Sequence, residues 1–536
     1  AKSPLTGALA SSEAGGWFGH ELKRAGLDAL VVHGKSEKPV YLWVKNGEIE
    51  IRPANHLWGK LTADTQGKIQ AELEDEKIRI AQIGPAGENL VRYAAVMHDV
   101  NRAAGRSGLG AVMGSKNLKA VAARGSARIG LAAKDKFKDT LKWITSTYKD
   151  SMGWAISYGT AGSVGFNHDS GSTGIRNYQD GILEGIENLV ADNFFPKFVT
   201  ARDTCSHCAV KCKLVVNYDD GETKIDGAYG GPEYESFGGL GPLCAVNNPA
   251  AVAKANELRA AYGLDTISAG GTIAFAMECQ EKGLLDDYEF QPQFGDGADL
   301  VEAIRQIARR EGLGDMMAEG SARMSAQMGP ETAEFLAVAR AQELPLHDPR
   351  FKNTTGMGYA LSATGADHMH NLIDNFANFA GSDDCARLGE MGMETPLPLW
   401  GISEQKVQGY IYETAFKNVL DSAVICHFYP YEYKHLVEAL NAAGDWDVDK
   451  DEINTIGTRI ITLARLYLIR EGFTHADDNL SARAFYALKE GPIEGRTLNA
   501  DELAQAMQVY FEKMGWDEKG VPSAESLSSL GLGNLP

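Results

Sequence analysis

The hydrophobic periodicity of the chain changes once, and this change restricts the fold more than any other feature. Before about residue 130, short β-type apolar runs are interspersed with glycine. The run at 40–52, VYLWVKNGEIEIR, is typical of a hairpin with an Asn-Gly turn and one buried face. After that point apolar residues recur at i, i+3, i+4 and i+7, which predicts amphipathic helices. The sequence therefore predicts an α+β protein with a β-rich N-terminal layer followed by two mainly α-helical domains.

The expected elements follow from the same periodicities. Further strands are expected at 29–34, 77–84 and 119–125. Helices are expected at 134–148, 249–263, 299–312, 454–472 and 500–516. Because 536 residues exceed what one hydrophobic core usually serves, the composition shifts predict three domains, at 1–130, 131–337 and 338–536.

Charge and composition exclude several classes of partner. The net charge is −20, which argues against nucleic acid or an anionic membrane as the main partner. No run of eighteen apolar residues occurs, so no membrane span is expected. The first residues show neither a signal peptide nor an initiator Met, so we expect a mature or truncated form. Seven cysteines, odd in number and four of them isolated, indicate a reducing, cytoplasmic compartment rather than a disulfide framework.

Three cysteines stand together in DTCSHCAVKCK: Cys205, Cys208 and Cys212. Three explanations compete for the spacing C-x-x-C-x-x-x-C. A zinc site usually shows a second C-x-x-C pair or a His pair, and the nearby His207 lies inside the loop. A C-x-x-C redox pair leaves Cys212 unexplained. An iron–sulfur cluster takes three close thiolates and one distant one, so the spacing favours a cluster over zinc, with a structural role third.

A glycine-rich stretch, Ile83–Val121, carries two arginines, Arg102 and Arg106. Glycine allows backbone N–H groups to approach a ligand closely, and the guanidinium group of Arg can bind phosphate through two hydrogen bonds. The stretch matches neither a P-loop nor a Rossmann fingerprint. On composition alone, a phosphate site and a series of turns in a β layer are equally good readings.

Taken together, the chain resembles the tungsten-containing aldehyde ferredoxin oxidoreductases. The motifs that carry the resemblance stand in family order: SPLTG (3–7), GGWFG (15–19), AGENL (86–90), NRAAGRSGLGAVMGSKNLKA (101–120), GPEYES (231–236) and GLDTIS (263–268). The resemblance covers essentially the entire chain and implies the family fold. About eighty residues that the family normally carries before SPLTG are absent from this sequence.

The resemblance implies a tungsten held by two molybdopterin-type cofactors, a 4Fe-4S cluster and a Mg²⁺ that bridges the pterin phosphates. Cys205, Cys208 and Cys212 are implied as cluster ligands, and Cys426 as the distant fourth. Cys244, Cys279 and Cys385 match no ligand position and are expected to be packed apolar side chains.

Cofactor contacts are implied by further family positions. Phosphate and magnesium contacts fall on Gly15, Arg102, Ala103, Gly105 and Arg106, while Glu13 stands where the family has an Asn. The two pterin segments, D-x-x-G-L-[CD] in the family, read AAYGLD at 260–265 and DSAVIC at 421–426. The residues expected to bind the pterins are Leu264 and Asp265 in the first segment and Asp421 and Ile425 in the second. Ala260 cannot make the acidic side-chain contact of the first.

Glu235 in GPEYES and His368 in GADHMHN match the family candidates for acid–base chemistry, with His370 a second choice. The default for a single Glu or His is a surface carboxylate or a core histidine, so only their motif positions favour catalysis. The subunit-bridging metal of some members is not expected, because Lys254 and Val301 occupy ligand positions.

The resemblance implies an enzyme that oxidises aldehydes to carboxylic acids. Electrons would pass through the cluster to ferredoxin or a dedicated small iron–sulfur subunit, and an oligomer is expected. One alternative within the superfamily is reduction of a carboxylic acid or an aromatic thioester. Another, from a different class, is a non-catalytic iron–sulfur relay that has lost its pterin.

Overall fold

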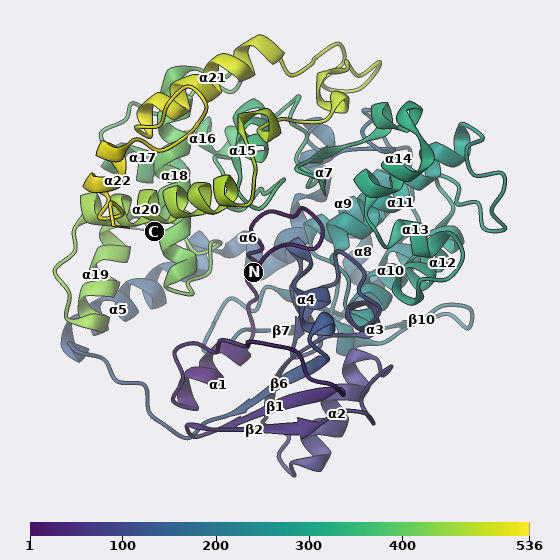
Figure 1. Cartoon of the computed structure of the whole chain (residues 1–536), viewed down its shortest axis with the longest axis horizontal. Coiled ribbons are helices and arrows are strands. Elements are labelled where there is room, and N and C mark those ends of the chain that lie inside the picture. The colour runs from purple at the N-terminus through teal and green to yellow at the C-terminus, as the bar shows by residue number, and fades with distance from the viewer. Residues whose placement is uncertain (535–536) are drawn as a thin grey trace. The chain divides into compact units, whose positions relative to one another are not determined.

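The computed structural model describes residues 1–534, which fall into two compact units. The first unit comprises residues 1–129, 154–336 and 341–346. The second comprises residues 130–153, 337–340 and the chain from 347 onward. The expected fold class is confirmed, since a β-rich N-terminal region precedes a chain that is otherwise mostly helical (Figure 1). The three-domain division made from the sequence stays a prediction.

A six-stranded sheet forms the N-terminal region of the first unit, in the order β2-β1-β6-β3-β4-β5. Its strands are β1 (Val40–Lys45), β2 (Glu48–Pro53), β3 (Arg79–Gln82), β4 (Val96–His98), β5 (Arg102–Ala104) and β6 (Leu118–Arg124). Only the β1–β6 pair is parallel; the other neighbours run antiparallel. The strands predicted at 77–84 and 119–125 are confirmed as β3 and β6.

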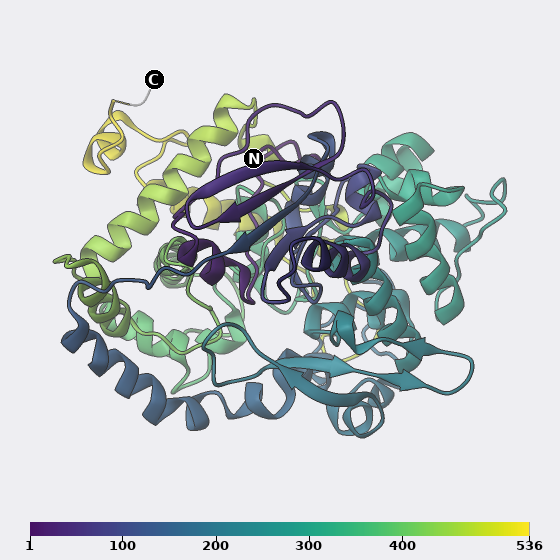
Figure 2. The same ribbon diagram turned by 90° about the horizontal axis from the view of Figure 1, so that it is seen from below.

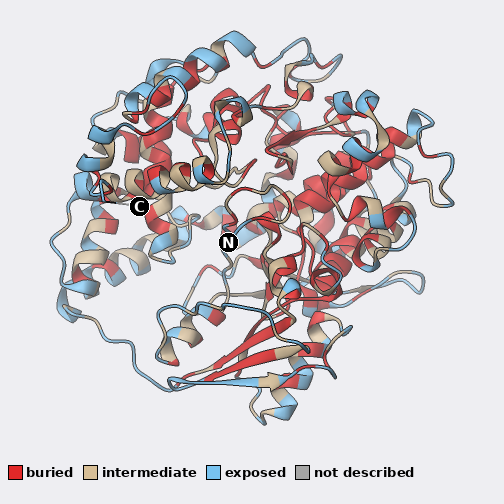
Figure 3. Cartoon of the chain, in the orientation of Figure 1, coloured by how far each residue is buried: buried red, intermediate tan, exposed pale blue. Residues whose placement is uncertain are grey.

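The predicted hairpin is confirmed, but its predicted burial is wrong. Asn46 and Gly47 both have positive φ, 48° and 89°, as a two-residue hairpin turn requires. Strand β1 is buried on both faces, because Leu42 packs into one apolar cluster and Tyr41 into another on the opposite face. Strand β2 lies at the sheet edge and is mostly exposed, as the pale blue of Figure 3 shows. The predicted strand at 29–34 does not form; the segment lacks regular structure.

Two helices of the first unit cover the two faces of the sheet. Helix α1 (Phe18–Arg24) packs its Phe18 on one face of the sheet, and α2 (Thr62–Glu72) packs its Ile69 on the other. The remaining helices are α3 (Pro85–Glu88), α4 (Leu109–Ser115), α6 (Gly153–Tyr158), α7 (Val164–Asp169), α8 (Ala191–Phe198), α9 (Tyr234–Leu240), α10 (Pro249–Tyr262), α11 (Thr266–Glu281), α12 (Gly297–Arg309), α13 (Leu313–Met317) and α14 (Ser321–Met328).

A separate hairpin of the first unit consists of β7 (Val199–Asp203) and β8 (Lys213–Val216). In Figure 2 it runs apart from the purple strands of the N-terminal sheet. The loop between its strands spans residues 204–212 and therefore contains all three clustered cysteines. Two further short strands are β9 (Tyr218–Asp219) and β10 (Lys224–Ile225).

The second unit is helical. Its helices are α5 (Lys134–Ser151), α15 (Asn353–Leu361), α16 (Asp374–Ala377), α17 (Asp383–Glu390), α18 (Glu404–Ser422), α19 (Tyr433–Gly444), α20 (Lys450–Arg470), α21 (Ala500–Lys513) and α22 (Ala524–Ser529). Helices α18, α19 and α20 share an apolar cluster that includes Phe416, Leu436 and Ile453. Gly457 on α20 permits close packing, because a Cβ there would lie 2.1 Å from the Ala415 carbonyl oxygen of α18.

All five predicted helices are confirmed, as α5, α10, α12, α20 and α21. Side-chain caps explain where several of them begin: Asn248, Asp296, Asp449 and Asn499 each accept from two backbone N–H groups at a helix start. None of the helices in the described residues 1–534 is both long and apolar enough to cross a bilayer.

Candidate functional site

The loop that joins β7 to β8 presents the three clustered thiols. Thr204 Oγ1 donates to the Cys208 carbonyl oxygen at 2.7 Å, and the Cys208 amide donates to the Cys205 carbonyl oxygen at 3.1 Å. Positive φ at His207 and Lys211 turns the backbone between successive cysteines. Each of the three cysteines is partly exposed. All seven cysteines lie within the described residues and none forms a disulfide.

The three sulfurs of this loop are candidate ligands of a metal centre. Thiolates that are each about 2.3 Å from one tetrahedral zinc lie only about 3.8 Å from one another. Among the described residues, the groups whose ligand atoms all lie within 4.8 Å of one another do not include these three sulfurs. A cubane cluster binds each thiolate at a different iron and holds them farther apart. The kind of metal centre at these thiols stays a prediction.

The predicted phosphate positions lie in the first unit. Arg102 is on β5, where its Nη2 lies 3.6 Å from Asp203 Oδ2 and its Nη1 donates to Asn101 Oδ1 at 3.2 Å. Ala103 follows on the same strand. Gly15 lies beside Arg102, because a Cβ built on Gly15 would be 4.0 Å from Arg102 Nε. The side chain of Arg102 is only 10% exposed, so its position is fixed by these neighbours.

Arg106 and Asp265, which the resemblance assigns to different cofactor contacts, are neighbours. Arg106 Nε lies 3.4 Å from Asp265 Oδ2, and Arg106 Nη2 donates to the Glu343 carbonyl oxygen at 2.7 Å. A Cβ on Gly105 would be 3.5 Å from Asp265 Oδ1. Arg106 Nη1 is buried and makes no hydrogen bond to the described residues. An anionic phosphate could accept a hydrogen bond from this unbonded N–H group. These residues therefore fit a phosphate-bearing cofactor.

Backbone contacts set the position of Asp265. Its carboxylate caps α11 by accepting from the amides of Ile267 at 3.2 Å and Ser268 at 3.1 Å. Its own amide donates to the Tyr93 carbonyl oxygen at 3.0 Å. Leu264 is fully buried, and its amide donates to the Arg259 carbonyl oxygen at 2.8 Å. A carboxylate has about four acceptor sites, so the cap leaves Asp265 capacity for a ligand.

The predicted second pterin segment begins at the end of α18 in the second unit. Asp421 Oδ1 accepts from His427 Nε2 at 2.5 Å, and its other oxygen accepts from His370 Nε2. His370 Nδ1 donates in turn to Asp367 Oδ2 at 2.6 Å. Ile425 packs against the apolar cluster of α18–α20, and Cys426 after it is exposed. Sequence reasoning missed Asp367 and His427, although each lies within three residues of a predicted site residue.

Burial and hydrogen bonding shift the pKa values of Asp421 and His370 in opposite directions. Burial raises the pKa of the Asp421 carboxyl, but hydrogen bonds from the two histidines outweigh it and hold that pKa at about 2. Burial lowers the pKa of His370, but the two carboxylates outweigh it and raise that pKa well above its ordinary value. The ligand atoms of His370, Asp421 and His427 lie close enough for one metal ion, yet these hydrogen bonds already explain the arrangement.

The two predicted acid–base residues lie in different units. Glu235 is in the first turn of α9, where its Oε2 accepts from the Leu346 amide at 2.9 Å. His368 is partly buried in the second unit beside His347, with ring centroids 5.2 Å apart. Lys352 Nζ donates to His347 Nδ1 at 2.6 Å. Burial, with Lys352 and His368 adding to it, lowers the pKa of His347 well below its usual value. His347 was missed because LPLHDPR shows no periodic or motif signal for it.

Comparison with known proteins identifies the family. The profile described as "Aldehyde ferredoxin oxidoreductase, N-terminal domain" matches residues 1–125, and that described as "domains 2 & 3" matches residues 139–532. The chain belongs to the aldehyde ferredoxin oxidoreductase family. It is therefore an enzyme, and the resemblance identified from the motifs is confirmed.

The sequences of several relatives align with nearly the whole of this chain. It is 37% identical to the tungsten-containing aldehyde ferredoxin oxidoreductases of Pyrococcus furiosus and Thermococcus kodakarensis, over 99% of this chain and 86% of each relative. It is 29% identical to the "aliphatic sulfonate oxidoreductase, WOR-like subunit" of Pyrococcus furiosus, over 99% of this chain and 84% of that relative. The solved BamBC complex of benzoyl coenzyme A reductase shares the fold, with a TM-score of 0.83 at 22% identity, over 99% of this chain and 85% of that one.

Proposed function

We propose that this family member oxidises aldehydes to carboxylic acids at a tungsten–pterin centre and passes the electrons to ferredoxin or a small iron–sulfur subunit. In the net reaction, the aldehyde and one water give the acid, two protons and two electrons. When bound, the tungsten–pterin group would supply two-electron redox chemistry at the substrate carbon. A cluster takes one electron at a time, so a one-electron acceptor suits it.

One observation carries the proposal: the first unit combines a guanidinium whose buried Nη1 makes no hydrogen bond to the described residues with a loop that holds three thiols. Arg106, with Arg102, would bind the pterin phosphates. Cys205, Cys208 and Cys212 would hold three irons, and Cys426 the fourth. Gly15, Ala103 and Gly105 would present backbone to the phosphates and Mg²⁺, as the resemblance implies.

The protein's own part in the chemistry is proton transfer and orientation. We assign Glu235 and His368 to this role, since each belongs to a family motif and neither is fully buried. A Glu carboxylate can accept a proton from the attacking water, and an imidazole N–H can donate to the carbonyl oxygen as charge develops there. Asp421 and Ile425 in one unit, and Leu264 and Asp265 in the other, would position the pterins.

Metal analysis of the isolated protein tests the proposal first. Tungsten with about four irons per chain is expected, whereas zinc alone or iron without tungsten would contradict it. Aldehyde oxidation must then exceed both the reduction of a carboxylic acid and the reduction of an aromatic thioester under matched conditions. The reductive alternative rests on fold likeness alone, because the benzoyl coenzyme A reductase complex is only 22% identical.

Cys426→Ser tests the distant cluster ligand, and Cys385→Ser is its matched control. Loss of one corner thiolate should leave a three-iron or empty site, and activity should fall with it. Cys385 is buried and its Sγ contacts the carbonyl oxygens of Ala377 and Phe379, so its variant should keep a four-iron spectrum. A full four-iron spectrum in Cys426→Ser would refute the assignment. None of the seven cysteines forms a disulfide, which suits the cytoplasmic location that we propose. We also propose an oligomer, as the resemblance implies.

A further inference from the structure

A hydrogen bond from backbone to sulfur links the N-terminal loop to the cysteine loop. The Gly16 amide donates to Cys205 Sγ at 3.1 Å. Gly15 lies against the same sulfur, because a Cβ built there would be 2.9 Å from Cys205 Sγ. Gly16 has a φ of +106°, a conformation that L side chains rarely adopt. Both glycines are therefore needed for this contact, one for space and the other for backbone conformation.

Two further hydrogen bonds hold the N-terminal loop on either side of Cys205. The Ser206 amide donates to the Gly16 carbonyl oxygen at 3.0 Å. The Trp17 indole Nε1 donates to the Thr204 carbonyl oxygen at 3.0 Å. We call residues Gly15–Trp17, with these three bonds, the cysteine clamp. All of it lies in the first unit.

We propose that the cysteine clamp tunes the reduction potential of the cluster bound at Cys205. This inference rests on the proposed function, because it needs the cluster. Hydrogen bonds to cluster sulfurs are among the features that set cluster potentials. Adding one electron makes the cluster and its thiolates more negative, so the Gly16 N–H stabilises the reduced form more than the oxidised form. The clamp thus favours electron entry into the cluster.

The clamp also lies beside the side chain of Arg102, which is expected to bind a pterin phosphate. A Cβ on Gly16 would be 3.3 Å from Arg102 Cγ, and one on Gly15 would be 4.0 Å from Arg102 Nε. The Trp17 amide donates to Asp99 Oδ2 at 3.3 Å, which ties the clamp to the N-terminal sheet as well. A shift of Arg102 would consequently be transmitted to the hydrogen bond on Cys205. The same three residues connect the phosphate-binding arginine with a cluster ligand.

Trp17→Phe tests the clamp by removing one donor while keeping an aromatic ring. In the isolated holoenzyme, a redox titration followed by EPR should show a lower cluster potential. Weakening one hydrogen bond should reduce the equilibrium constant for one-electron reduction about twofold to tenfold. Tenfold corresponds to about 59 mV for one electron. Trp58→Phe is the control, since Trp58 is a partly buried residue in a turn of the same unit.

Gly15→Ala provides a second perturbation, because its methyl group would displace the Cys205 sulfur from the Gly16 amide. The cluster potential of the Gly15→Ala enzyme should fall at least as far below the wild-type value as that of the Trp17→Phe enzyme. Should a variant lose its cluster, wild-type enzyme labelled with ¹⁵N-glycine decides the matter. Its reduced cluster should show a coupled ¹⁵N and an exchangeable proton by ENDOR, as a glycine N–H bound to sulfur requires.

The inference is wrong if both variants titrate like Trp58→Phe, or if the labelled wild-type enzyme shows no glycine nitrogen coupled to the cluster. Failure of the proposed function has a different signature, because the wild-type enzyme itself would then contain no tungsten or no four-iron signal.

Discussion

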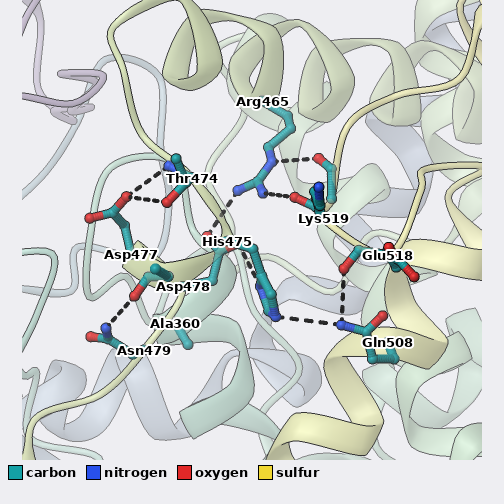
Figure 4. Close-up of polar contacts among 12 residues, drawn as sticks. Ala360, Arg465, Thr474, His475, Asp477, Asp478, Asn479, Gln508, Glu518 and Lys519 are labelled. Atoms are coloured by element: carbon teal, nitrogen blue, oxygen red, sulfur yellow. Dashed lines mark hydrogen bonds and ion pairs between the residues drawn. The ribbon is translucent and has the colours of Figure 1, made fainter.

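Asp478 is the acceptor at the centre of a buried polar network in the second unit. It is 2% exposed and accepts from Arg465 Nη1 at 2.9 Å and from Arg340 Nη2. His475 Nδ1 lies 3.3 Å from its other oxygen, and Figure 4 shows His475 continuing to Gln508. The side chains of Arg340 and Arg465 are 0% and 4% exposed. One carboxylate therefore pairs with two buried guanidinium groups.

Asp478→Asn should be strongly destabilising. Asparagine keeps the shape and one carbonyl oxygen but removes the negative charge that pairs directly with both buried cations. Burial already lowers the pKa of Arg340, and Asp478 is the main group that opposes this effect. Breaking a buried ion pair from one side costs about 3–5 kcal/mol. For a unit of this size, that is a fall in melting temperature of roughly 6–20 °C.

Asp477→Asn is the matched control, one residue earlier with the same chemical change. Asp477 Oδ2 accepts from the Thr474 amide at 2.7 Å at the start of a short helical turn, as Figure 4 shows. Losing such a cap contact should cost about 1 kcal/mol or less. Scanning calorimetry of the isolated enzyme measures both variants, and hydrogen exchange in α20, which carries Arg465, reports on the second unit. If the two variants melt within 2 °C of each other (roughly 1 kcal/mol or less), the reasoning is refuted.

Three further predictions concern other groups. Because the pKa of His370 is raised by its two carboxylate neighbours, their stabilisation is complete below about pH 6.5 and is lost as pH rises through the raised pKa. The melting-temperature deficit of His370→Gln should therefore shrink in alkaline buffer, and a constant deficit would contradict this. Burial raises the pKa of Cys279 to about 12 and that of Cys244 further, so iodoacetamide should label them only after denaturation, as peptide mass spectrometry can check. Glu235→Gln and His368→Asn should each lower the rate per bound tungsten by about 100-fold or more, and near-normal rates would remove them from the mechanism.

The parts of the fold that the sequence predicted correctly are those marked by local features, such as helix caps and terminating glycines. Helix α10 was predicted within one residue, because Asn248 caps its start and Gly263 follows its end with a φ of +77°. The strand predicted at 29–34 failed because β propensity does not supply a pairing partner, and Val31 is 74% exposed. The burial of β1 on both faces depends on α1 and α2, which pack on it from elsewhere in the chain.

The features of the candidate site also fall into those that the sequence could predict and those that it could not. Cysteine spacing and family motifs predicted cluster ligands and phosphate contacts, because these residue types carry chemistry in their side chains, and those roles stay predictions. The chain of hydrogen bonds from Asp367 through His370 to Asp421 was not predicted. His370 and Asp421 are 51 positions apart in the sequence, and neither residue's neighbours indicate the other. Contacts of this kind depend on how a loop between helices meets a distant helix end, which periodicity does not describe.

The cysteine clamp was the hardest feature to predict, because its donor is a backbone amide. Gly16 and Cys205 are separated by 189 positions, and an N–H group has no side-chain signature. The resemblance places Gly15 at the magnesium and phosphate contacts, yet Gly15 also lies against the sulfur of Cys205, a predicted cluster ligand. A substitution there must disturb both neighbours, so a loss of activity in Gly15→Ala cannot by itself distinguish a phosphate defect from a cluster defect. The cluster potential responds to the sulfur contact, whereas cofactor content responds to the phosphate contact, and measuring both separates the two roles.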